Sequence, residues 1–181
     1  MGELTFILGG ARSGKSSYAQ KLAEASGKSV TFIATAQALD DEMSARIQKH
    51  RADRHAAWKT LEIPQGIASY LRGNVIRSEC YLLDCITLLT TNLYMQFVED
   101  DLVHEEKAKL AVDNEVALLL AYIRDHDEEW IIISNEIGLG LVPPYQLGRV
   151  YRDHLGSANQ SLAREADQVI FMVAGIPMVV K

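Results

Sequence analysis

The residues with the clearest chemical meaning are 9–16, which read Gly-Gly-Ala-Arg-Ser-Gly-Lys-Ser. This segment fits the pattern G-x-x-x-x-G-K-[ST]. It follows an aliphatic run and opens a helical pattern, which is the context of a phosphate-binding loop. Glycines let the backbone wrap a polyphosphate, and successive N–H groups with a helix N-terminus form a concave positive site. We therefore predict that the nucleotide's phosphates are bound by Gly9, Gly10, Ala11, Arg12, Ser13, Gly14, Lys15 and Ser16.

Two residues of this loop have separate expected roles. Lys15 would neutralise the β and γ phosphates and so act in catalysis, and Ser16 would offer its hydroxyl to Mg²⁺. The metal needs a carboxylate that ends a neighbouring hydrophobic strand, and Asp84, after Tyr81-Leu82-Leu83, fits that position. Without the phosphate loop, the simpler interpretation of such a carboxylate is a polar residue that caps a buried strand. The phosphate loop favours the metal role for Asp84.

A second chemical group is the basic stretch between positions 40 and 55. Its cationic residues and histidines are Arg46, Lys49, His50, Arg51, Arg54 and His55. If a helix begins near Asp41, arginines four positions before and after His50 flank it, beside an apolar stripe. Neighbouring positive charge favours the neutral, nucleophilic imidazole. The pattern leaves two interpretations open: a covalent nucleophile, or a bystander in a basic helix C-terminus that complements the helix dipole.

Other polar residues carry weaker signals. Glu136 follows the hydrophobic run 130–134 at what should be the carboxyl end of a strand. It suits a base, a metal-shell group or a loop carboxylate without a catalytic role. His104, His126 and His154 look like surface residues, and no role is assigned to them.

The elements that must position these residues alternate between short aliphatic runs and helical patterns. Strands are predicted at residues 4–8, 30–34, 81–84, 130–134 and 168–173, with a weaker one at 58–63. Helices are predicted at 15–26, from Asp40 as the cap, around 110–123 and around 147–162, and a hairpin closes the chain after Gly175. Near-continuous hydrophobicity suits strands buried on both faces. The pattern predicts an α/β fold with a mainly parallel sheet and helices on both faces.

Length and charge bound the remaining possibilities. The 181 residues suit a single domain spanning 1–181. A net charge of -6, from 18 Lys+Arg against 24 Asp+Glu, argues against a nucleic-acid backbone as the partner. No run is long enough to cross a bilayer, no signal peptide is recognisable, and two cysteines make no disulfide framework. We therefore expect a cytoplasmic protein.

Several blocks together resemble one known family. These blocks are GGARSGKS at 9–16, FIATAQALDDEMSARIQKHRADR at 32–54, YLLDCITLLTTN at 81–92 and SNEIGLGLVP at 134–143. In them and in the tail from Arg149, the sequence resembles the bifunctional adenosylcobinamide kinase / adenosylcobinamide-phosphate guanylyltransferases of cobalamin biosynthesis. The resemblance is thin only around 66–78 and 97–124. The phosphate loop is shared with many NTPases, whereas the second and fourth blocks are far more specific.

This resemblance implies a P-loop, RecA-like fold, a homotrimer, GTP and ATP as substrates, and a corrinoid acceptor too large to enter the domain's interior. It implies that His50 is the guanylylated nucleophile, and that Lys49 stands where some relatives have a second histidine. Beyond the phosphate loop, the implied GTP contacts are Ala34, Thr35, Ala36, Arg51, Ala52, Asp53, Arg54, Glu62 and Asp84. Two rivals remain: a generic P-loop small-molecule kinase without a covalent intermediate, and a nucleotide-gated binding module.

Overall fold

The computed structural model describes residues 2–38, 40–52, 54–100 and 102–181; for residues 42, 46, 49, 50 and 52 it describes the backbone only. Within these residues, seven strands form one sheet in the order β3-β2-β4-β7-β1-β8-β9, in which only β9 is antiparallel to its neighbour. The strands are β1 (Leu4–Gly9), β2 (Val30–Ala34), β3 (Lys59–Glu62), β4 (Cys80–Asp84), β7 (Glu129–Ile133), β8 (Gln168–Val173) and β9 (Ile176–Val179). The predicted α/β class, mainly parallel sheet and closing hairpin are confirmed.

Helices connect the strands and cover the sheet. They are α1 (Lys15–Ala25), α2 (Asp41–Ala52), α3 (Ile67–Gly73), α4 (Ile86–Tyr94), α5 (Glu105–Asp125) and α6 (Gln146–Glu165). A 3-10 turn at Met95–Phe97 and the short ladder of β5 (Val98–Glu99) with β6 (Leu102–Val103) lie between α4 and α5. The sequence pattern did not predict α3, α4 or this ladder. All three are short, and a short segment shows too few turns for a helical period to stand out.

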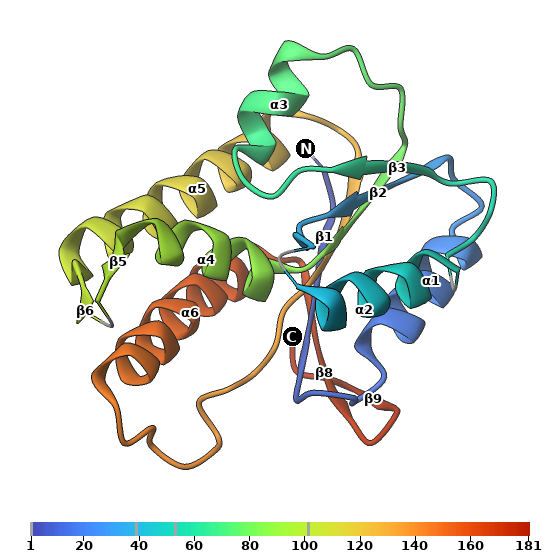
Figure 1. Ribbon diagram of the computed structural model, residues 1–181. Coiled ribbons are helices and arrows are strands. Elements are labelled where there is room, and N and C mark those ends of the chain that lie inside the picture. The colour runs from blue at the N-terminus through green and yellow to red at the C-terminus, as the bar shows by residue number, and fades with distance from the viewer. Residues whose placement is uncertain (1, 39, 53, 101) are drawn as a thin grey trace.

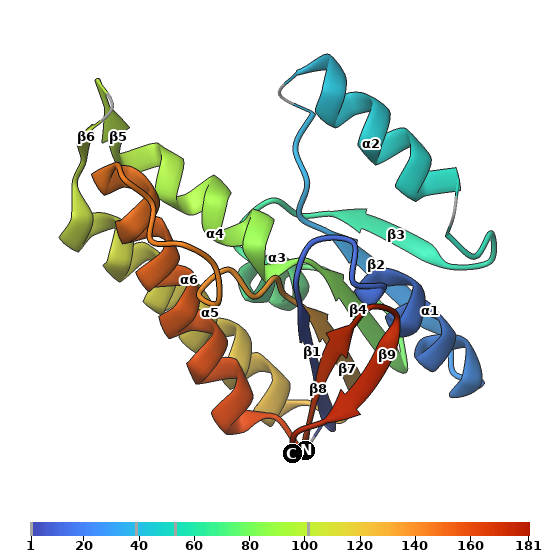
Figure 2. The same cartoon turned by 90° about the horizontal axis from the view of Figure 1, so that it is seen from below.

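The core lies on both faces of the sheet (Figures 1 and 2). Helices α3, α4, α5 and α6 cover one face, where they pack on residues such as Phe6 and Trp130. Helix α1 covers the other face through Ala19 and Ala23, which pack on Ile7 and its neighbours. Because successive residues of a strand point to opposite faces, the uninterrupted hydrophobic runs fill both layers.

Helix α2 stands outside these layers (Figure 2). Its predicted cap is confirmed, because the Asp40 Oδ1 accepts the Met43 backbone N–H at 2.7 Å. Among the α2 side chains that the structure describes, Met43 and Ile47 are half-buried, and none belongs to the hydrophobic core. The apolar side of α2 that was predicted beside His50 is therefore only partly buried and does not enter the core.

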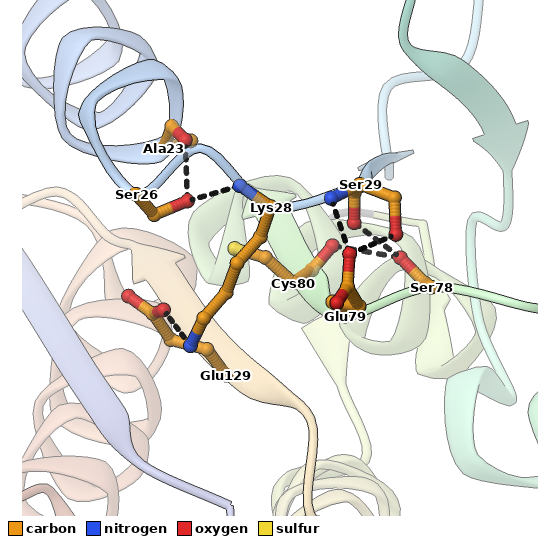
Figure 3. A network of polar contacts seen from close by, with 8 residues as sticks. All are labelled: Ala23, Ser26, Lys28, Ser29, Ser78, Glu79, Cys80 and Glu129. Atoms are coloured by element: carbon orange, nitrogen blue, oxygen red, sulfur yellow. Dashed lines mark hydrogen bonds and ion pairs between the residues drawn. The ribbon is translucent and has the colours of Figure 1, made fainter.

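The amino ends of the strands are joined by polar contacts (Figure 3). Lys28 Nζ donates to Glu129 Oε2 at 2.7 Å, which ties the start of β2 to the start of β7. The backbone N–H and the hydroxyl of Ser29 both donate to Glu79 Oε2 at 2.9 Å, which ties β2 to β4. The Leu4 N–H donates to Asp167 Oδ2 at 2.8 Å and ties β1 to β8. These contacts fix the end of the sheet opposite the phosphate loop.

One expectation about individual residues is wrong. His154 is not a surface residue: it lies on the inner side of α6, 4% exposed, beside the Tyr94 ring. Burial lowers the pKa of His154, which favours the neutral ring. Both cysteines are free and buried, and burial raises the pKa of each thiol to about 12, which makes them poor nucleophiles. None of the described helices is long and apolar enough to cross a membrane.

Candidate nucleotide-binding active site

The phosphate loop connects the carboxyl end of β1 to α1, as its sequence predicts. Gly14 adopts φ +93°, a conformation that favours glycine, and a Cβ there would lie 3.2 Å from Gly175 Cα. A Cβ at Gly9 would lie 2.6 Å from the Met172 carbonyl oxygen. The Gly175 N–H donates to the Ser13 carbonyl at 2.9 Å, so the β8–β9 turn supports the loop from outside. Close packing therefore requires both glycines.

Lys15 lies buried inside this loop, where its Nζ donates to the Gly10 carbonyl at 2.7 Å. Burial lowers the pKa of Lys15, and the nearby Asp84 carboxylate partly opposes this effect. A buried ammonium with few partners gains strongly from an arriving anion, because little water competes for it. The position of Lys15 therefore suits its predicted role on a polyphosphate.

The two predicted metal ligands lie in contact. Ser16 Oγ donates to Asp84 Oδ2 at 2.8 Å, although 68 positions separate them. A hydroxyl and a carboxylate are the hard oxygen donors that Mg²⁺ prefers. No group of three or more metal-binding His, Cys, Asp or Glu side chains occurs among the described residues. A cation here would therefore complete its shell with phosphate oxygens and water.

Thr35 holds the end of β4 in place. Its Oγ1 donates to the Cys85 carbonyl at 2.8 Å and accepts the Cys85 N–H at 2.9 Å, and its own N–H donates to the Asp84 carbonyl. Ala34 and Thr35 are buried, so of the predicted contacts 34–36 only Ala36, which is half-buried, is open to a ligand. Thr35 thus acts in this structure by positioning Asp84.

Asn92 is a positioning residue that the sequence reasoning did not single out. Its Nδ2 donates to the Thr35 carbonyl at 2.8 Å and to the Pro64 carbonyl at 2.9 Å. It lies on α4, which was not predicted. The only signal was its place at the end of the block 81–92 that resembles the family.

A cavity of about 370 Å³ lies beyond Asp84, between the end of α2 and β3. Its lining residues are Arg51, Arg54, His55, Ala56, Trp58, Thr60 and Glu62. The structure therefore brings together three residues that were predicted to contact GTP: Arg51, Arg54 and Glu62. The Arg51 guanidinium pairs with the Glu62 carboxylate. The His55 and Trp58 rings stack with centroids 5.6 Å apart and form an aromatic wall.

Arg54 links this cavity to the metal pair. Its guanidinium lies 4.1 Å above the Phe32 ring centroid, and its buried Nε and Nη1 have no hydrogen-bond partner. Burial lowers the pKa of Arg54, while the Asp84 carboxylate opposes that effect. Buried donors without partners are costly and favour an anionic ligand. Arg54 thus fits its predicted role as a GTP contact.

The remaining predicted residues lie outside the described part of the site. The backbone of His50 and Ala52 belongs to α2, next to Arg51, but their side chains are outside the described residues, and so is Asp53. The nucleophilic role of His50 stays a prediction.

Fold and site together define a P-loop α/β enzyme that binds a nucleoside triphosphate at the carboxyl end of its sheet. Comparison with known proteins gives the family. Residues 5–180 match the family described as cobinamide kinase / cobinamide phosphate guanyltransferase, and the chain belongs to it. Its members are bifunctional enzymes of adenosylcobalamin synthesis, which use nucleoside triphosphates and cobinamide.

Named relatives match over nearly their whole length. The bifunctional adenosylcobalamin biosynthesis protein CobP of Pseudomonas aeruginosa is 45% identical over 97% of this chain and 95% of its own. The corresponding CobU of Salmonella typhimurium is 38% identical and that of Escherichia coli 36%, each over 98% of this chain and 99% of its own. Among solved structures, the RadB recombinase is similar with a TM-score of 0.48 and 16% identity, over 93% of this chain and 73% of that chain.

Proposed function

We propose that this enzyme carries out two reactions at one phosphate loop. It phosphorylates the hydroxyl of adenosylcobinamide with ATP or GTP, and then transfers GMP from GTP to the resulting phosphate through a guanylyl group on His50. The product is adenosylcobinamide-GDP. The observation that carries this proposal is the convergence of Lys15, the Ser16–Asp84 pair and Arg54 around a single loop in a member of this family.

Ser16 and Asp84 would hold Mg²⁺ in both reactions, since their oxygens already touch. The ion would supply positive charge that offsets the negative charge of the phosphate groups. Lys15 supplies the rest of that charge from inside the loop.

In the kinase reaction, the substrate hydroxyl attacks the γ-phosphorus. The bond from that phosphorus to the β–γ bridging oxygen breaks, and the nucleoside diphosphate leaves. Lys15 stabilises the charge that develops on the leaving oxygen, because its ammonium is held beside the loop backbone and shielded from water. The protein's main contribution is positioning plus electrostatics, as in other phosphoryl transfers.

In the guanylyl transfer, a neutral His50 nitrogen attacks the α-phosphorus of GTP and pyrophosphate leaves. A phosphoramidate to GMP forms, and the phosphate of the corrinoid then attacks the same phosphorus and displaces the imidazole. Two displacements through a covalent intermediate let one site serve both half-reactions. Support comes from Arg51 and Arg54, which lie near the end of the same helix and line the adjoining cavity.

We further infer a homotrimer that works in the cytoplasm. The trimer follows from the family resemblance, and the sheet offers a face for it. Strand β9 forms one edge of the sheet, and Ile176, Met178 and Val179 on it are all more than half exposed. An exposed apolar edge strand is a ready pairing surface for another chain. The cytoplasm is where nucleoside triphosphates are supplied.

The test is product analysis by mass spectrometry. The purified enzyme is incubated with Mg²⁺ and adenosylcobinamide, first with ATP and then with GTP. The proposal expects a gain of one phosphate and then a gain of one GMP with release of pyrophosphate. Phosphate transfer without any GMP transfer would instead indicate a generic small-molecule kinase. Nucleotide binding without transfer to the corrinoid would indicate a binding module.

A further inference from the structure

A second cavity lies apart from the nucleotide cavity and shares no lining residue with it. Its volume is about 350 Å³, and it lies between the segment that follows β7 and the middle of α6. Its lining residues are Gly138, Arg152, Asp153, Gly156, Ser157 and Gln160. Figures 1 and 2 show the segment 134–145 and α2 on different sides of the β1–α1 connection. We call this cavity the α6 groove.

The α6 groove is connected to the phosphate loop by backbone contacts. The Glu136 N–H donates to the Gly9 carbonyl at 3.0 Å, two residues before Gly138 of the groove. Asn159 Nδ2 donates to the Asn135 carbonyl at 3.1 Å, which holds α6 against the same segment. A molecule in the groove would therefore lie beside the end of β1, where the phosphates bind.

Gly156 indicates that the groove is kept open. A glycine in the interior of a long helix costs stability, yet a Cβ at Gly156 would meet nothing within 4 Å. Gly148 in the same helix has a packing reason, because a Cβ there would lie 2.6 Å from the Tyr145 ring. At Gly156, by contrast, a side chain would contact no neighbour, so packing does not explain why a glycine is present. Its missing side chain leaves room in the groove.

The segment beside the groove is unusually apolar for an exposed loop. Leu139, Leu141, Val142 and Tyr145 are all more than half exposed, and Leu141 is 96% exposed. Exposed apolar residues that gather in one segment mark a contact surface. The groove itself offers hydrogen-bonding groups from Arg152, Asp153, Ser157 and Gln160. The surface thus combines an apolar shelf with amide-binding groups.

We propose that the α6 groove and the loop 139–145 bind the corrinoid acceptor. This inference rests on the proposed function. A corrinoid has methylated faces and a periphery of amide side chains, so its face suits the apolar loop and its amides suit the groove. The groove is too small for a whole corrinoid and takes only one edge. The arm that carries the reacting hydroxyl then extends toward the phosphate loop, while the nucleotide approaches from the cavity near β3.

The test fills the groove without disturbing the fold. Gly156→Gln places a side chain where a Cβ meets no neighbour, and it replaces a glycine in a helix interior by a better helix former. We expect the KM for adenosylcobinamide and for its phosphate to rise about tenfold or more, with the melting temperature equal or higher. The KM for GTP and the covalent GMP labelling, which needs no corrinoid, should be unchanged. Gly73→Gln, also open at its Cβ and outside the groove, is the matched control.

A second variant covers the case in which Gly156→Gln fails to fold. Gln160→Ala removes one exposed hydrogen-bonding group from the groove and should also raise the corrinoid KM with an unchanged GTP KM. Unchanged corrinoid KM values in a folded Gly156→Gln enzyme would overturn the assignment. A changed sedimentation coefficient together with a shift of both KM values would make this face a subunit contact instead. If the wild type transfers neither phosphate nor GMP to the corrinoid, the proposed function itself has failed.

Discussion

The two ends of the sheet use their polar residues in opposite ways. At the amino end, Lys28 donates to the Glu129 carboxylate and Glu79 accepts two hydrogen bonds from Ser29, so both have partners within the protein (Figure 3). At the carboxyl end, Lys15 is buried on a single carbonyl, and two Arg54 nitrogens and the Ser13 hydroxyl have no partner. Buried donors without partners cost stability, whereas matched ones contribute to it.

Whether a polar residue has a partner within the protein separates residues that stabilise the fold from residues available to bind a ligand. Both groups lie at strand ends and use the same residue types: the amino-end serine, lysine and carboxylate precede a hydrophobic run, and the carboxyl-end ones follow it. What distinguishes Lys28 and Glu79 from Arg54 and Ser13 is whether their hydrogen bonds are completed within the protein, although Glu128 Oε2 at the amino end is also buried without a partner. Substitutions at the carboxyl end should therefore change catalysis, and those at the amino end should change stability alone.

The largest effect is expected for Lys15→Ala. Removing the buried ammonium takes away charge stabilisation that both reactions need, so kcat should fall about 10²–10³-fold for phosphate and for GMP transfer. Steady-state assays of each reaction, with Lys28→Ala as a control lysine at the amino end, measure this. Full kinase turnover in Lys15→Ala would contradict the shared phosphate loop.

A smaller effect is expected for Asp84→Asn. The amide keeps an oxygen that can accept from Ser16 Oγ, but it loses the negative charge that a divalent cation needs. The Mg²⁺ concentration for half-maximal activity should rise about tenfold or more while the melting temperature changes little. A magnesium titration of both reactions measures this. An unchanged magnesium requirement would leave Asp84 as a polar cap on β4.

The smallest effect, on stability only, is expected for Glu79→Gln. The backbone and the hydroxyl of Ser29 donate to Glu79 and lower the pKa of its carboxyl. A carboxyl whose pKa is lowered on folding contributes stability above its ordinary pKa, near 4.5, and loses it as the pH falls through the folded value. Denaturant melts of Glu79→Gln should therefore show a flatter loss of stability below pH 4.5 than the wild type, with kcat and KM unchanged at pH 7. A changed kcat or KM in Glu79→Gln would contradict the expectation that amino-end substitutions affect stability alone.

The phosphate loop and the sheet could be predicted because their signals are local. Residues 9–16 form a contiguous motif, and the strands at 30–34 and 168–173 coincide with β2 and β8. The pairing of Ser16 with Asp84 also followed, since the carboxyl ends of parallel strands meet at one edge of the sheet.

Other features depend on packing between distant segments and left no local pattern. His154 reads as a surface histidine until α6 is placed against α4. Thr35 holds the end of β4 only because β2 lies beside it, and Asn92 ties α4 to the segments that follow β2 and β3. The α6 groove depends on the position of the loop after β7, which the sequence pattern does not fix.

The central claim is that His50, beside one shared phosphate loop, carries GMP between GTP and the corrinoid. The most direct measurement is covalent labelling with α-labelled GTP and Mg²⁺ in wild type, His50→Ala and the exposed control His104→Ala. We predict an acid-labile, base-stable label on wild type and on His104→Ala, and none on His50→Ala. Normal labelling of His50→Ala would contradict the account.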